Sequence, residues 1–206
     1  MAKELPLISS ADRFHDECAV FGIYGHKEAA NLAYLGLYAL QHRGQEASGI
    51  VSNDGEQFYV EKGQGHVADI FSQQALARLP GSMAIGHNRY STAGGAGLKN
   101  VQPLSVNFAF GNLAVAHNGN LINATMLRSE LEAYGAIFQS TSDTEVIIHL
   151  IAHSRADTLL DRVIDSLTQV RGAFSVVLMT DQGVIAARDP HGFRPLCLGR
   201  FRDAWI

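Results

Sequence analysis

Cysteine is scarce in this chain of 206 residues, which contains only Cys18 and Cys197. Two cysteines so far apart in sequence do not provide the disulfide framework of a small secreted domain, a structural zinc site or an iron-sulfur site, because each of these needs more ligands at closer spacing. Reduced cysteines are the rule in the cytosol. We therefore expect a cytoplasmic protein with no metal or cofactor in this chain.

Long apolar runs and basic clusters are also missing. No run approaches the ~20 apolar residues that a membrane-spanning helix needs, and residues 1–17, which end in Asp16 and Glu17, do not have the pattern of a secretory signal. The 16 Lys and Arg residues are scattered, and the formal net charge is -4. These features argue against nucleic acid and membrane partners and favour a small ligand. Residues 1–17 are either a frayed tail or a propeptide.

The remaining composition is that of a compact globular protein, with 47% hydrophobic and 17% charged residues. Short apolar runs between turn residues predict strands at 18–24, 48–52, 57–62, 83–87, 106–110, 113–116, 173–179, 184–188, 196–199 and from 204 onward. Apolar residues at helical spacing predict helices at 28–42, 72–79, 123–134, 140–151 and 158–170. The predicted buried stripe of the last helix consists of Leu159, Leu160, Val163, Ile164 and Leu167.

Several of the predicted strands, such as 174–179, are apolar on both faces, so the sheets need cover on both sides. The hairpin pattern of the strands indicates mainly antiparallel pairing, with Gly111 and Asn112 forming one of the turns. The sequence therefore predicts an α+β fold in which two stacked antiparallel sheets are covered by helices, a four-layer αββα sandwich.

Cys18 opens an apolar strand directly after Asp16 and Glu17. If the bond between Glu17 and Cys18 were cut, one residue would carry both a thiol and a free α-amine. An α-amine has a pKa of about 7.7 to 8.0, so it can accept the thiol proton near neutral pH and make Cys18 the nucleophile of an acyl transfer. The alternative is a structural cysteine, since free cysteine is among the most buried residue types.

Asn118 and Gly119 place a side-chain amide beside an unhindered backbone N–H, which is the donor pair that an oxyanion hole uses. The alternative is an Asn-Gly hairpin turn, but a helical pattern, not a returning strand, follows this pair. The pair is therefore a candidate for stabilising a tetrahedral intermediate.

Arg89 and Asp143 are candidates for binding an amino acid. Arg89 is predicted to lie in a loop after a strand, where a guanidinium can bind a carboxylate with two hydrogen bonds. Asp143 lies in the sequence 142–145, which reads as a capping box, and it could pair with an ammonium group. The alternatives are a surface arginine and an aspartate that only complements the helix dipole.

The histidines do not predict a metal site. His87 and His117 each end a predicted strand, and a packing role is the more common one for such residues. His149 and His153 are four residues apart on one helix, but the sequence between them lacks the glutamate of the HExxH zinc motif.

Seven motifs occur in a fixed order from Cys18 to the end of the chain: CAVFGIYG, LQHRGQEASGI, GHNRYSTAG, NVQPL, AHNGNL, SDTEV and DPHGFRPLCLG. In this order they resemble the glutaminase domain of the amidophosphoribosyltransferase family. The resemblance implies a class II glutamine amidotransferase domain over residues 18–206 with the fold of the N-terminal nucleophile hydrolases. It also implies that residues 1–17 are a propeptide.

The same resemblance implies a role for each matching residue. Cys18 is similar to the nucleophile, with its own α-amine as general base, and Asn118 with Gly119 is similar to the oxyanion hole. The expected substrate-binding residues are Arg89 for the glutamine carboxylate, Asp143 for its ammonium, Arg43 as a supporting arginine near the nucleophile, and Thr92 as a further contact.

The implied reaction releases ammonia from glutamine through a Cys18 thioester. In the family the ammonia passes to a phosphoribosyltransferase domain, which forms 5-phosphoribosylamine from phosphoribosyl pyrophosphate in the first step of purine synthesis. This chain lacks that domain, so we expect a truncation at Ile206 and expect magnesium, a possible 4Fe-4S cluster and homo-oligomer formation only in the full-length protein. The alternatives are a glutaminase domain of the glucosamine phosphate or asparagine synthase type, and a non-catalytic glutamine-binding module.

Overall fold

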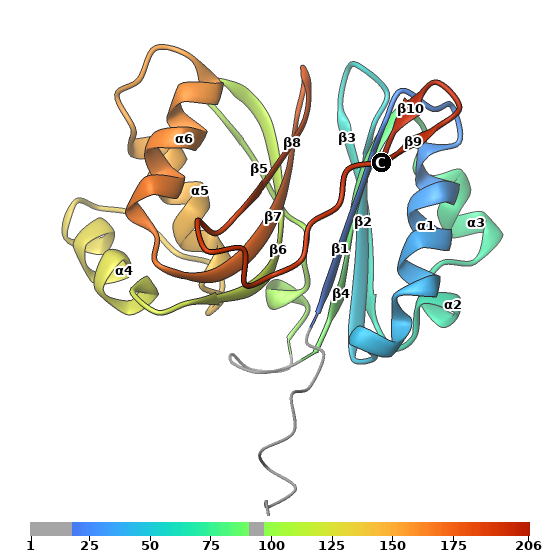
Figure 1. The fold of residues 1–206 in the computed structure, drawn as a ribbon, viewed down its shortest axis with the longest axis horizontal. Helices are drawn as coiled ribbons and strands as arrows, with labels where there is room; N and C mark the ends of the chain where they lie inside the picture. Colours follow the sequence, from blue (N-terminus) through green and yellow to red (C-terminus); the bar gives the residue numbers. More distant parts are fainter. Residues whose placement is uncertain (1–17, 91–96) are drawn as a thin grey trace, which may run out of the picture.

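The computed structural model describes residues 18–90 and 97–206. The predicted propeptide, residues 1–17, and Thr92 lie outside these described residues. The described chain contains a six-stranded sheet with the order β3-β2-β4-β1-β10-β9 and a four-stranded sheet with the order β5-β6-β7-β8. The two sheets stand face to face in the middle of the molecule, and helices cover the outer face of each (Figure 1).

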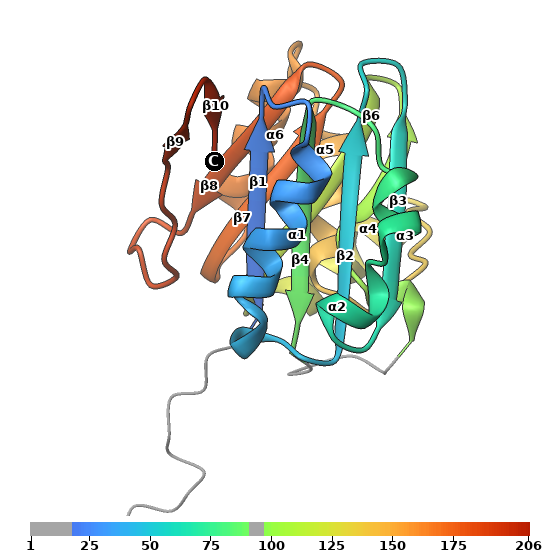
Figure 2. The ribbon, with the colours of Figure 1, turned by 90° about the vertical axis from the view of Figure 1, so that its right-hand side faces the viewer.

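The six-stranded sheet is built mainly from the first part of the chain. Its strands are β1 (Ala19–Tyr24), β2 (Ala47–Asn53), β3 (Phe58–Gln64), β4 (Met83–Arg89), β9 (Arg200–Phe201) and β10 (Ala204–Trp205), and every pairing is antiparallel. Figure 2 shows the helices on its outer face, which are α1 (Ala29–Ala39), α2 (Val67–Ile70) and α3 (Gln73–Ala77).

The four-stranded sheet follows in sequence. Its strands are β5 (Leu104–Phe108), β6 (Gly111–Leu121), β7 (Gly172–Thr180) and β8 (Gly183–Arg188), again in antiparallel pairs. The helices α4 (Ala124–Ala133), α5 (Thr144–His153) and α6 (Leu159–Gln169) lie on its outer face (Figure 1). Within the described residues, no helix has the length and apolar character needed to span a membrane.

Three apolar layers hold these parts together. One lies between α1–α3 and the first sheet and includes Leu37 and Ile50. A second lies between α4–α6 and the other sheet and includes Ile147 and Val176. The third lies between the two sheets, where Val51, Met83, Ile85, Ala114, Ala116, Val177 and Met179 are buried. The predicted four-layer αββα sandwich is therefore confirmed, including the requirement that β7 be covered on both faces.

Some element boundaries differ from the prediction. The first long helix ends at Ala39 and not at 42, because a 3-10 turn, η2 (Gln41–Arg43), follows it and the Gln41 side chain accepts the Val67 N–H at the start of α2. The hairpin between β5 and β6 turns at 109–110, so Gly111 and Asn112 belong to the second strand.

The predicted strand at 196–199 is wrong. The chain after β8 instead turns around the buried Asp189 carboxylate, which accepts the backbone N–H groups of His191, Phe193 and Arg194. Four N–H bonds, the fourth from Phe174, outweigh the effect of burial and lower the pKa of Asp189. This turn directs the following residues away from β8 as an irregular segment up to β9.

The predicted buried stripe of α6 is also too wide. Leu160 and Ile164 are 54% and 53% exposed, whereas Val163 and Ser166 are buried. The Ser166 hydroxyl donates a hydrogen bond to the Arg162 carbonyl one turn earlier, so a polar residue is satisfied on the inner face. The helix thus buries a narrower strip than the periodicity of its apolar residues indicates.

Candidate functional site

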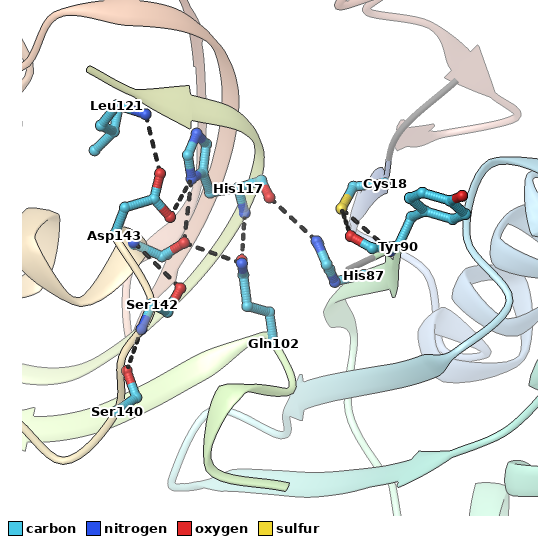
Figure 3. Close-up of polar contacts among 10 residues, drawn as sticks. Cys18, His87, Tyr90, Gln102, His117, Leu121, Ser140, Ser142 and Asp143 are labelled. Carbon is cyan, nitrogen blue, oxygen red and sulfur yellow. Dashed lines mark hydrogen bonds and ion pairs between the residues drawn. The ribbon is translucent and has the colours of Figure 1, made fainter. Parts of the chain in front are cut away.

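A cavity of about 260 Å³ lies where the ends of the two sheets meet. Four of the predicted site residues line it: Cys18, Arg89, Gly119 and Asp143. Cys18 precedes β1 and Arg89 ends β4, both in the six-stranded sheet, whereas Gly119 lies in β6 and Asp143 precedes α5. Figure 3 shows how Cys18 and Asp143 approach the site from opposite sides. The site is therefore built by both halves of the sandwich.

Cys18 is partly exposed and not a core residue, so its interpretation as a buried structural cysteine is wrong. Its thiol donates to the Tyr90 carbonyl, with a sulfur–oxygen distance of 3.6 Å, and accepts the Tyr90 N–H at 3.4 Å. The Arg43 Nε–H donates to the Cys18 carbonyl at 3.0 Å. The φ of Cys18 is 53°, a left-handed value that is uncommon for residues other than glycine. The predicted supporting arginine thus lies beside the predicted nucleophile.

Asn118 and Gly119 lie inside strand β6, opposite Ser175 and Phe174 of β7, so the hairpin-turn alternative is wrong. Gly119 has a φ of +149°, and a Cβ atom there would lie 2.1 Å from the Ala173 carbonyl oxygen. Only glycine fits this position. The strand can therefore present an unhindered N–H group at this point.

Asn118 does not line the cavity. It lines a neighbouring groove together with Ala19, the residue after Cys18, and with Arg43. Its buried Oδ1 atom has no hydrogen-bond partner among the described residues. Asn118 therefore lies near Ala19 in the groove, whereas Gly119 lines the cavity together with Cys18.

Arg89 is the last residue of β4, so the prediction of a loop position is wrong. The pairing of β4 with β2 continues to the end of the strand, where Arg89 lies opposite Ala47. Only 7% of Arg89 is exposed, so it is not a surface arginine either. Its guanidinium therefore brings a positive charge into the wall of the cavity.

Asp143 connects α5 to β6 and does not act as part of a capping box. Its Oδ2 atom accepts the Leu121 N–H at 3.0 Å, and its Oδ1 atom lies 3.7 Å from Nδ1 of His117. Burial would raise the pKa of Asp143, but the contacts with His117 and with the N–H groups of Leu121 and Thr144 outweigh burial and lower it. Asp143 thus brings a negative charge to the cavity.

Glu145, the last residue of the predicted capping box, has another role. Its carboxylate accepts hydrogen bonds from the backbone of Gln139 and from both the backbone and the hydroxyl of Ser140. Glu145 therefore fixes the segment before α5, which leaves the carboxylate of Asp143 available to β6.

Two buried histidines connect the sheets, in agreement with a packing role. Nε2 of His87 lies 3.1 Å from the His117 carbonyl oxygen. Because a carbonyl can only accept, this nitrogen carries the proton of the neutral ring. Nδ1 of His117 lies 3.1 Å from the Thr144 hydroxyl oxygen. Figure 3 shows His87 between the Cys18 side and the His117 side of the site.

His87 should make the fold sensitive to acid. Burial lowers the pKa of His87 to about 3, whereas an unfolded histidine has a pKa near 6.5. As the pH falls below 6.5 the unfolded state binds the proton first. The stability contributed by neutral His87 is thus complete above pH 6.5 and is lost toward pH 3, by ~1.4 kcal/mol per pH unit. We expect this slope between pH 4.5 and 6.5 in urea unfolding.

The matched variants are His87→Gln and His66→Gln. The first keeps an N–H donor for the His117 carbonyl but cannot titrate, so its unfolding free energy should depend less on pH. His66 is exposed, and its variant should keep the wild-type slope. An equal slope in wild type and His87→Gln would show that other groups cause the acid sensitivity.

The cavity wall contains residues for which the sequence predicted no role. They include Asn100, Gln102, Thr141 and Arg128. Gln102 belongs to the motif NVQPL, and this motif was the available signal, although the spacing of its residues does not reveal which groups they contact. Within residues 18–90 and 97–206, no three His, Cys, Asp or Glu side chains come together as a metal site, so the absence of a metal stays a prediction.

Comparison with known proteins relates this arrangement to glutamine-using enzymes. Over 91% of its own length, the chain is 56% identical to the amidophosphoribosyltransferase of Rhizobium etli. Over 97% of its own length, it is 48% identical to that of Bacillus subtilis. It covers 38% and 42% of these two relatives, so it spans about two fifths of their length.

Solved structures give the same result for the fold. The glutamine phosphoribosylpyrophosphate amidotransferase of B. subtilis, solved with ADP and GMP, matches with a TM-score of 0.86 and 49% identity, over 90% of this chain and 40% of that one. A structure described as the allosteric regulatory enzyme of purine biosynthesis matches with a TM-score of 0.87 and 51% identity, over the same shares.

Residues 87–206 match the family model of the glutamine amidotransferase domain. This match covers more than half of the chain and includes Arg89, Gly119 and Asp143. It agrees with the similarity to the solved amidotransferases, which extends over the whole sandwich. The chain therefore belongs to the glutamine amidotransferase domain family.

Proposed function

We propose that this chain is the glutaminase part of an amidophosphoribosyltransferase and that it releases ammonia from glutamine by way of a Cys18 thioester. The observation that carries the proposal is the single cavity lined by Cys18, Arg89, Gly119 and Asp143. It combines a thiol, a backbone N–H and two opposite charges, which is the set of groups that an amide-hydrolysing site for an amino acid needs.

The two charges suit the α-carbon groups of glutamine. Arg89 would bind the carboxylate with its planar guanidinium. Asp143 uses Oδ2 for the Leu121 N–H, and its Oδ1 atom, which lies 3.7 Å from Nδ1 of His117, would bind the ammonium group from the cavity side. Because the pKa of Asp143 is lowered, it is ionised at neutral pH and can form this ion pair. Binding both groups would leave the side-chain amide directed toward Cys18.

The chemistry requires cleavage between Glu17 and Cys18. The new α-amine takes the thiol proton, and the thiolate forms a C–S bond to the amide carbon. The C–N bond then breaks, and the departing nitrogen takes the proton back and leaves as ammonia. Water cleaves the C–S bond in the second half of the reaction. The unusual φ of Cys18 involves the peptide bond before it, so cleavage also removes this constraint.

Gly119 and Asn118 would stabilise the negative charge that develops on the amide oxygen. The Gly119 N–H faces the cavity side, and the Asn118 side chain reaches the region of Cys18 from the neighbouring groove. Arg43 holds the Cys18 carbonyl and so fixes the orientation of the nucleophile. Thr92 is proposed as a further substrate contact because it belongs to the motif GHNRYSTAG.

The acceptor is proposed from the relatives, because the chain covers only 38% and 42% of the amidophosphoribosyltransferases of Rhizobium etli and Bacillus subtilis. Ammonia would pass to a phosphoribosyltransferase domain and displace pyrophosphate from phosphoribosyl pyrophosphate. Magnesium and any 4Fe-4S cluster would belong to that domain, because a cluster needs four cysteines and this chain has two. We also propose a cytoplasmic homo-oligomer for the full-length protein.

The decisive experiment compares a chain that begins at Cys18 with one that begins at Glu17. Both contain the thiol, but only the first has the α-amine on the same residue. We expect ammonia release from the first and none above background from the second, with glutamine binding retained in both. Intact mass identifies the N-terminus of each preparation.

Equal activity of the two chains would show that the α-amine is not the base. Binding without hydrolysis in both would identify a glutamine-binding module. In the full-length protein, glutamine-dependent release of pyrophosphate from phosphoribosyl pyrophosphate supports the acceptor, whereas use of a sugar phosphate or aspartate would indicate another class II amidotransferase.

A further inference from the structure

Strand β6 has a free edge at the cavity. β5 pairs with it only from Gly111 to Val115, whereas β7 continues to pair with it as far as Leu121. The backbone groups on the β5 side of residues 117–121 therefore have no strand opposite them. A free edge normally exposes a row of N–H and C=O groups to other partners.

Two side chains replace the missing strand at this edge. The His117 N–H donates to Oε1 of Gln102 at 2.7 Å, and the Leu121 N–H donates to Oδ2 of Asp143 at 3.0 Å. The N–H groups of residues two apart in a strand point to the same edge. The Gly119 N–H therefore points to this edge as well, between the two occupied positions.

The opposite strand supports this orientation. Phe174 lies across from Gly119. Its N–H donates to the Asp189 carboxylate and its carbonyl accepts the Asp189 N–H at 2.9 Å, so both of its backbone groups point toward β8. Gly119 and Phe174 are thus a pair without mutual hydrogen bonds, and the Gly119 N–H is directed to the cavity that Cys18 lines.

Gln102 also ties β6 to the substrate side of the cavity. Its Nε2 atom donates to the Thr144 hydroxyl oxygen at 3.0 Å, and Thr144, which is fully buried, follows Asp143 at the start of α5. Gln102 itself is only 8% exposed. One carboxamide therefore holds both the strand that carries Gly119 and the helix end that carries Asp143.

We infer that Gln102 is a positioning residue, which sets the separation between the Gly119 N–H and the Asp143 carboxylate. The inference rests on the proposed function, in which these two groups bind the two ends of glutamine. Small displacements of a group that acts in the transition state are costly, with losses of about 100-fold for about 1 Å. Gln102 does not itself touch the reacting atoms.

The expected signature is a loss in kcat. The Gly119 N–H binds negative charge that exists only in the transition state, and loss of such an interaction lowers kcat. Asp143 stays attached to the Leu121 N–H, so glutamine binding should change little. For Gln102→Met we expect a kcat about 10- to 100-fold lower and a KM within about threefold of wild type.

The test is a double-mutant cycle in the processed protein with Gln102→Met, Thr144→Val and both together. Since the two side chains form one bridge, their effects on kcat should not add. Thr144→Ser keeps the hydroxyl and should retain wild-type kinetics. Asn112→Ala, at the far end of β6, is the matched control. The carboxamide of Asn112 also forms hydrogen bonds through both its oxygen and its nitrogen, with Asn107 and Asp181.

Amide NMR spectra of the same variants separate this inference from the proposed function. In Gln102→Met, the His117 amide should exchange faster and the Gly119 amide resonance should shift, with both unchanged in Asn112→Ala. If the wild type releases no ammonia, the proposed function fails. The exchange of the His117 amide and the shift of the Gly119 resonance then still test whether Gln102 positions β6. An unshifted Gly119 resonance, additive effects on kcat, or a purely KM effect would overturn it.

Discussion

Replacing Cys18 with alanine is expected to abolish ammonia release from glutamine. Alanine keeps the α-amine at the new N-terminus but removes the only thiol that lines the cavity. Loss of the catalytic serine of a serine protease costs about 10⁶-fold in kcat, and a loss of this size here would leave no rate above background. The measurement is ammonia release by chains that begin at residue 18, which makes the comparison independent of propeptide removal.

Cys197→Ala provides the matched control. Cys197 is exposed and lies outside the cavity, so its variant should release ammonia at the wild-type rate. Glutamine binding by Cys18→Ala, measured by calorimetry, should persist, because Arg89 and Asp143 remain. Undiminished ammonia release by Cys18→Ala would disprove the thioester mechanism.

Replacing Gly119 with alanine should have the second largest effect, and it should affect both activity and stability. The added Cβ would lie 2.1 Å from the Ala173 carbonyl oxygen, so β6 and β7 must separate at this point. The movement displaces the Gly119 N–H, which is the proposed oxyanion donor, and removal of one such donor costs about 10²- to 10³-fold in kcat. The assay is ammonia release together with the urea midpoint of unfolding.

Gly55→Ala separates the two causes of this effect. Gly55 also has a positive φ, +102°, but a Cβ there meets no atom within 4 Å. Its variant should show only the modest destabilisation of a residue other than glycine with positive φ, and unchanged kcat. Wild-type kcat in Gly119→Ala would remove Gly119 from the site.

The order of the elements and the four layers could be predicted from the sequence because each depends on local pattern. Apolar runs such as that of β7 require cover on both faces, and hairpin turns imply antiparallel pairing. The boundaries failed where hydrogen bonds between a side chain and the backbone decide them. Asp189 is an example, because its carboxylate accepts the N–H groups of His191 and Arg194 in a turn, and the chain after this turn is irregular where a strand is predicted at 196–199.

In the candidate site, too, residue types could be predicted from the sequence, whereas positions that depend on long-range contacts could not. The residue types of Arg89 and Asp143 indicate an amino-acid ligand, but the sequence placed the first in a loop and the second in a capping box. Their positions follow from long-range pairing, of Arg89 with Ala47 and of Asp143 with Leu121. Gln102 received no role because its partners lie 15 and 42 residues further along the chain.

The origin of the cavity walls in two different sheets has a mechanical consequence. Cys18 and Arg89 move with one sheet, and Gly119 and Asp143 with the other. The spacing between the sheets is set by the layer of side chains between them, in which β6 contributes two alanines, Ala114 and Ala116. The thickness of this layer therefore determines how closely the sulfur atom and the N–H that would bind the oxyanion can approach. Side chains that never contact the ligand thus belong to the geometry of the reaction.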